Sequence, residues 1–115
     1  DYINFHGTST LINDKVETLA VKQTFNSQAM NIPSSSTKSM VGHPQGASGA
    51  LGVTVSALSL KNGFMTPTIN MENPDPECDM DYVANVGRES KINIAVSNCI
   101  SFGSKNSAIV LKNFR

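Results

Sequence analysis

Apolar and polar residues alternate at the start of the chain. Ile3 and Phe5 fall on one side of an extended segment. Tyr2, Asn4 and His6 fall on the other side. This period of two is the pattern of a β-strand. We therefore expect the chain to open in a strand. An apolar strand without a starting Met fits either a processed or trimmed N-terminus or the second part of a longer chain.

A helical period follows the strand. The spacing of apolar residues predicts an amphipathic helix over 14–25. Asp14 stands at its start and Glu17 follows three residues later, which is the arrangement of a capping box. The apolar positions are Val16, Leu19, Ala20 and Phe25.

A second helix is predicted over 44–60. Pro44 suits its first turn, and the basic residue and glycine of 61–63 suit its end. The first half is rich in Gly, Ala and Ser, which let another backbone approach closely. The second half is apolar on most sides. We therefore expect this helix to be buried.

Strands dominate the last quarter of the chain. The order of elements, β-α-loop-α-loop-β-β, predicts an α/β fold with a sheet of mixed direction. The remaining expected segments are a connection at 26–33 ending in a short strand, a polar loop at 34–39, a proline-containing irregular stretch at 65–79, a short strand at 82–85, strands at 92–96 and 107–111, and a turn-bearing stretch at 97–104.

Composition narrows the function classes. The 115 residues carry nine basic and nine acidic side chains, so the formal net charge is zero. A nucleic-acid binder should show a basic stripe, and a membrane span needs about 18 apolar residues in a row. Neither pattern is present. The length allows one domain at most, and a cysteine count of two fits the reducing cytoplasm.

Two histidines stand at positions where they could do chemistry. His6 ends the first strand, and His43 directly precedes the second predicted helix. The positive end of a helix dipole should keep His43 neutral. Two neutral imidazoles facing one point could stabilise a developing oxyanion. Each could equally be a structural residue. Lys38 could add charge to the same site or be a solvated loop lysine.

Other catalytic motifs fail on spacing. The Ser-x-x-Lys pattern of 35–38 lacks the Ser-Asp-Asn and Lys-Thr-Gly partners of penicillin-recognising enzymes. Cys78 and Cys99 lack the spacing of a zinc site. Cys78 lies between Glu77 and Asp79, whose negative charges should raise its pKa and weaken it as a nucleophile.

Four segments in order resemble a known family. They are 4–10 (NFHGTST), 35–43 (SSTKSMVGH), 67–70 (PTIN) and 74–79 (PDPECD). They resemble the C-terminal part of β-ketoacyl-acyl-carrier-protein synthases, the condensing enzymes of fatty-acid and polyketide synthesis. The match covers nearly the whole chain.

The resemblance implies a thiolase-like fold with layered helices and a mixed sheet of five-stranded type. It also implies decarboxylative Claisen condensation of an acyl thioester with malonyl-carrier protein. His6 and His43 match the family's two catalytic histidines, and Lys38 matches its lysine. The residues expected to contact substrate are Thr8, Thr10, Phe102 and Gly103.

The resemblance makes residues 1–115 a single partial domain. The family's nucleophilic cysteine belongs to an N-terminal half, and neither cysteine of this chain matches it. We expect the fragment alone to be inactive. The implied partners are that N-terminal half, an acyl carrier protein whose phosphopantetheine carries the substrates, and a second ketosynthase in a homodimer or heterodimer. No metal or organic cofactor is expected.

The chain also departs from the family pattern. Fatty-acid members carry Glu at the position of Gly52, where it can pair with the lysine, whereas polyketide members often have Gly. The family loop NSFGFGGTN is replaced at 98–106 by NCISFGSKN. Ser101 and Ser104 should restrict the backbone, and Lys105 adds a charge. A competing hypothesis is therefore a non-catalytic, chain-length-factor-like or decarboxylase-only partner subunit.

Overall fold

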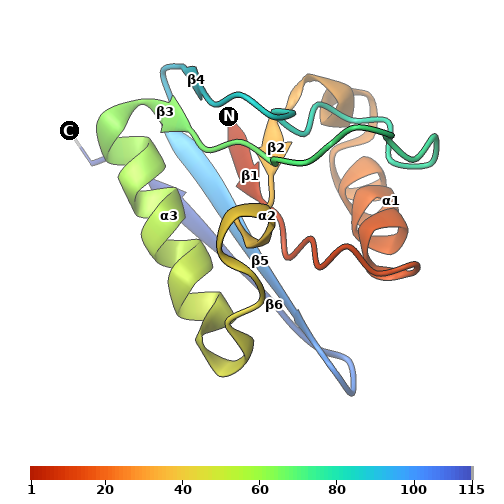
Figure 1. Ribbon diagram of the computed structural model, residues 1–115. Helices are drawn as coiled ribbons and strands as arrows, with labels where there is room; N and C mark the ends of the chain where they lie inside the picture. Colours follow the sequence, from red (N-terminus) through yellow and green to blue (C-terminus); the bar gives the residue numbers. More distant parts are fainter. Residues whose placement is uncertain (115) are drawn as a thin grey trace.

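A mixed β-sheet runs through the protein in a computed structural model, which describes residues 1–114 (Figure 1). Its strands, in spatial order, are β2 (Ser34–Ser35), β1 (Tyr2–Asn4), β5 (Ile94–Ser101) and β6 (Lys105–Lys112). The first three are parallel, and β6 is antiparallel to β5. The expected α/β class with a mixed sheet is confirmed. The central sheet has four strands within the described residues, and the fifth strand implied by the resemblance has no counterpart there.

The alternation predicted for the first strand is present, and both of its sides are buried. Tyr2 contributes to one apolar core and Ile3 to the other. Helices cover both faces of the sheet, so each side of β1 has a partner layer. The first core contains Tyr2, Leu60, Met65, Val83, Ile92 and Ala95. The second contains Ile3, Phe5, Val21, Ala29 and Met80.

Helix α1 (Asn13–Phe25) matches the first predicted helix, but the predicted capping box is wrong. Ile12 occupies the N-cap and makes no side-chain cap bond. Asp14 instead accepts a hydrogen bond from the Ser9 amide at 3.2 Å. Glu17 lies four residues before buried Val21, on the inward face of the helix, so its carboxylate points into the protein. A short 3₁₀ helix (Asn26–Asn31) follows α1.

Helix α3 (Ser48–Asn62) begins four residues later than predicted. A 3₁₀ turn (Gln45–Ala47) precedes it, because Gln45 has a positive φ of 50° that is incompatible with an α-helix start. The predicted glycine stop is confirmed. Gly63 is left-handed, with φ 61°, and its amide donates to the carbonyl of Ser59.

The prediction that this helix is buried holds for one face only. The buried residues of α3 are small, apart from Leu60, whereas Leu58 is 51% exposed. Within residues 1–114 the helix packs mainly against β5 of the central sheet, and also contacts β3. The predicted close approach is confirmed at Gly52, where an added Cβ would lie 2.6 Å from the Ser97 hydroxyl oxygen.

The strands near the end of the chain are longer than predicted. Strands β5 and β6 pair from Ile94 opposite Lys112 to Ser101 opposite Lys105. The turn expected over 97–104 is therefore reduced to 102–104, because cross-strand pairing extends both strands through polar residues. The segment expected as a strand at 82–85 makes one bridge, from Thr68 to Ala84.

Three small elements complete the fold. Helix α2 (Lys38–Val41) lies at the end of the expected polar loop. Strands β3 (Phe64–Met65) and β4 (Arg88–Glu89) form a separate antiparallel pair that was not predicted. Within residues 1–114, no helix combines the length and hydropathy that crossing a membrane would require.

Candidate active site

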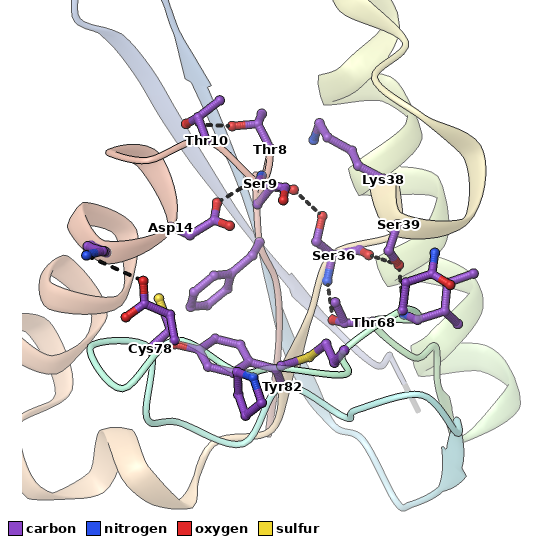
Figure 2. A pocket seen from close by; sticks show the side chains of 18 of the residues that line it. Thr8, Ser9, Thr10, Asp14, Ser36, Lys38, Ser39, Thr68, Cys78 and Tyr82 are labelled. Carbon is purple, nitrogen blue, oxygen red and sulfur yellow. Dashed lines mark hydrogen bonds and ion pairs between the residues drawn. The ribbon is translucent and has the colours of Figure 1, made fainter.

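A cavity of about 630 Å³ opens at the end of β1. Its walls come from the turn that follows β1, from the α2 region with Lys38 and His43, and from the irregular segment after β3. Figure 2 shows Lys38 and Ser39 on one side of this cavity, with Asp14 and Cys78 on the other. The topology thus brings together residues from distant parts of the sequence.

His6 lies just beyond β1 and is 5% exposed. Its backbone amide donates to Glu17 Oε1 at 2.8 Å, and the amide of Gly7 donates to Glu17 Oε2 at 2.9 Å. The ring Nδ1 is buried and has no hydrogen-bond partner among the described residues. One carboxylate therefore fixes the backbone that carries this imidazole.

His43 is held by the turn that precedes α3. The amide of Gln45 donates to His43 Nδ1 at 3.0 Å, and the Ser48 hydroxyl donates to the same atom at 3.0 Å. Because an amide N–H can only donate, Nδ1 takes the acceptor role here, which leaves Nε2–H as the donor of the ring. The predicted effect of a helix start on His43 does not apply, because α3 begins at Ser48 and not next to His43.

The two imidazoles are neighbours. Their ring centroids lie 5.4 Å apart with an interplanar angle of 82°. His43 lines the cavity, and His6 adjoins it without being part of the lining. This edge-to-face arrangement brings together the two histidines that the sequence separates by 37 positions.

Burial, the charge of Lys38 and the neighbouring His43 together lower the pKa of His6 to about 4, and burial is the largest of these causes. Asp14 opposes this change. Desolvation disfavours the charged imidazolium, and a nearby cation does the same. His6 is therefore a neutral imidazole at pH 7.

Lys38 is half-buried at the first position of α2 and lines the cavity. Burial lowers the pKa of its ammonium, while Cys99 and Glu17 favour the charged form. No ion pair to Lys38 occurs within the described part of the chain, which agrees with the absence of a glutamate at Gly52.

Glu17 is the site residue that the sequence argument missed. Its side chain is 1% exposed. Besides the two amides, it accepts bonds from Asn13 at 3.3 Å and Asn98 at 3.1 Å. Burial raises the pKa of this carboxyl, and the four hydrogen bonds oppose the rise. One signal in the sequence could have identified Glu17. It is an acidic residue four positions before Val21, which places it on the apolar side of the helix.

Hydroxyl groups connect the walls of the cavity. The Ser36 hydroxyl donates to the Gly7 carbonyl at 2.7 Å, and the Ser36 amide donates to Thr68 Oγ1 at 3.0 Å. The two threonines expected to contact substrate, Thr8 and Thr10, line the cavity. Figure 2 shows both at its rim.

The other two expected substrate residues lie elsewhere. Phe102 is 99% exposed at the tip of the β5–β6 hairpin, and neither it nor Gly103 lines the cavity. The predicted backbone restriction is present at Ser104, whose φ is 62°. It is absent at Ser101, which belongs to β5.

Both cysteines are free thiols. Cys78 lines the cavity. Burial raises the pKa of its thiol, and the charges of Asp75 and Asp14 add to the rise. The direction agrees with the prediction, although the charges come from these two residues and not from its sequence neighbours. Cys78 is therefore a weak nucleophile.

Comparison with known proteins extends this picture. Residues 1–72 match the family model described as "Beta-ketoacyl synthase, C-terminal domain". The chain is 50% identical over 111 residues to 3-oxoacyl-[acyl-carrier-protein] synthase 2 of Coxiella burnetii, covering 96% of this chain and 27% of that protein. It is 47% identical over 110 residues to the tetracenomycin polyketide synthase ketoacyl synthase alpha subunit of Streptomyces glaucescens, covering 96% of this chain and 26% of that protein. The chain thus spans about a quarter of the length of these relatives.

Solved structures agree with the sequence matches. The ishigamide ketosynthase/chain length factor superposes with a TM-score of 0.95 at 35% identity, over 100% of this chain and 28% of that one. A solved complex of a type II polyketide synthase acyl-carrier protein with its ketosynthase contains a chain that superposes with a TM-score of 0.93 at 36% identity. The match covers 99% of this chain and 28% of that one. The thiolase-like fold expected from the resemblance is confirmed, and the chain belongs to the β-ketoacyl synthase family.

Proposed function

We propose that this chain supplies the two histidines and the lysine of a β-ketoacyl synthase acting in fatty-acid or polyketide synthesis. The observation that carries the proposal is the His6–His43 pair, whose rings lie 5.4 Å apart beside a cavity also lined by Lys38. His6 is buried and neutral, and His43 accepts two hydrogen bonds at Nδ1.

The proposed step is decarboxylation of a malonyl thioester. The bond between the carboxylate carbon and Cα breaks, carbon dioxide leaves, and the electron pair forms an enolate on the thioester oxygen. His43 Nε2–H donates a hydrogen bond to that oxygen, and the charge of Lys38 favours the developing anion. His6 shields the same region from water and completes the imidazole pair.

The enolate carbon then attacks an acyl thioester carbonyl, and the thiolate leaves. The cysteine that holds this acyl group lies outside the present chain in our proposal, since Cys78 has a raised pKa and Cys99 lies in β5. We propose that an acyl carrier protein delivers the malonyl thioester, because a structurally similar ketosynthase has been solved in complex with its carrier protein. The chemistry uses side chains alone, and the two free thiols suit a reducing cytoplasm.

The alternative is a non-catalytic partner subunit. It rests on the altered 98–106 segment, with Ser104 at positive φ. The two histidines and Lys38 are nevertheless all present and grouped at one cavity, which favours the catalytic proposal.

The test uses the full-length protein that contains this chain. His43→Ala should lower decarboxylation of malonyl-carrier protein by about 10²–10³-fold, the usual cost of losing an oxyanion donor. His43→Gln should retain part of the rate, because its amide can still donate. Lys61→Met, at the far end of α3, is the control and should retain the full rate. An unchanged rate in His43→Ala would overturn the proposal.

A further inference from the structure

The irregular segment that forms one wall of the cavity is built as a closed loop. We call residues 69–85 the strap and its outer part, 72–79, the tip. Thr68 joins the two ends, because its amide donates to the Val83 carbonyl at 3.1 Å and its carbonyl accepts from the Asn85 amide at 2.8 Å. The Asn85 side chain also bonds both the amide and the carbonyl of Met71. Figure 1 shows this segment crossing to α1 and returning.

The two ends of the strap contain residues in the left-handed region of backbone space. Asn70 has φ 64° at one end, and Val83 and Asn85 have φ 48° and 62° at the other. Such residues are common where a chain changes direction. A β-branched valine there is strained, and its burial at 2% exposure fixes it. The strap therefore has firm ends.

The tip itself is held mainly by charge. Lys15 pairs with Asp75, at 3.4 Å, and with Glu77. Lys22 pairs with Asp79. Both lysines lie on α1, and these acidic side chains are 43–68% exposed. Apolar packing begins after the tip, at Met80.

The same tip forms cavity wall. Asn73, Pro74 and Asp75 line the cavity, as do Cys78 and the latching Lys15. Figure 2 shows Cys78 facing the cavity from this side, opposite Lys38. Exposed ion pairs are individually weak and are screened by salt. A wall held in this way can lift without disturbing the core.

We propose that the tip is a hinged wall of the cavity, latched by Lys15 and Lys22, and that its release widens the cavity for a carrier-bound chain. The part that concerns the carrier-bound chain rests on the proposed function. The hinged movement does not rest on it.

Cys78 provides an internal reporter of the movement. Alkylation of this thiol by N-ethylmaleimide can be followed in the full-length protein by mass spectrometry of its peptide, with the Cys99 peptide as reference. Lys15→Met and Lys22→Met should each speed Cys78 alkylation about two- to fivefold. Arg88→Met is the matched control, because Arg88 pairs with Asp81 outside the tip.

The direct charge effect of these substitutions has the opposite sign. Removing a lysine leaves unpaired carboxylates near Cys78, which disfavours the thiolate and slows alkylation. Faster alkylation of Cys78 alone would therefore report movement of the tip. Unchanged Cys78 alkylation, an equal increase in Arg88→Met, or an equal increase at Cys99 would each overturn the proposal. None of these readouts depends on synthase activity.

Discussion

The buried imidazole of His6 makes the stability of this protein sensitive to acid in a predictable range. A histidine in an unfolded chain has a pKa of about 6.5, whereas burial, Lys38 and His43 lower the pKa of folded His6 to about 4. The unfolded chain therefore takes up the proton first as the pH falls. The part of the unfolding free energy that depends on His6 is fully present above about pH 6.5. It is lost progressively between about pH 6.5 and pH 4.

The size of this effect follows from the difference between the two pKa values. Each unit is worth about 1.4 kcal/mol, so the loss across the whole interval is about 3 kcal/mol. His6→Gln removes the titrating ring and should remove this part of the acid sensitivity. Lys61→Met, at the far end of α3, is the control, because it leaves both imidazoles in place.

The assay is urea unfolding of the full-length protein at several pH values between 7 and 4.5. Between these limits the parent should lose about 2–3 kcal/mol more of its unfolding free energy than His6→Gln does. Titration of the ring by NMR provides a second measurement. Equal acid sensitivity in parent and His6→Gln, or a ring that titrates near pH 6.5, would refute the reasoning.

Two further substitutions test the packing around the site. Gly52→Ala should destabilise the full-length protein by about 1–3 kcal/mol in thermal unfolding, because the new Cβ would lie 2.6 Å from the Ser97 hydroxyl oxygen. Ser97→Ala should restore most of this loss in the double variant, and a purely additive result would contradict the proposed clash. Glu17→Gln should lower both stability, by about 1–3 kcal/mol, and decarboxylation, because an amide NH₂ would face the amide of His6 or Gly7. Measured values equal to the parent's would show that the carboxylate does not fix this backbone.

The elements of the fold follow closely from local sequence pattern. The alternation of 2–6, the apolar period of 14–25 and the glycine at 63 are short-range signals, and the structure contains the strand, the helix and the stop they predict. Boundaries were less accurate, since pairing with β6 carries β5 through the polar stretch 97–101. A strand boundary of this kind depends on the partner strand and cannot be read from one segment.

For the candidate site, the sequence determined which residues are available, and the tertiary structure decided how they act. His6, Lys38 and His43 could be named from motif and spacing, but their grouping depends on parallel pairing of β1 with β2 and on the turn before α3. Local charge pattern assigned Glu17 to a helix cap, whereas the structure uses it to hold the His6 backbone. Phe102 fitted a motif, yet the hairpin places it in solvent. The physical reason is that burial and hydrogen bonding between distant segments set the protonation state and the direction of a side chain. These interactions exist only once the layers have packed.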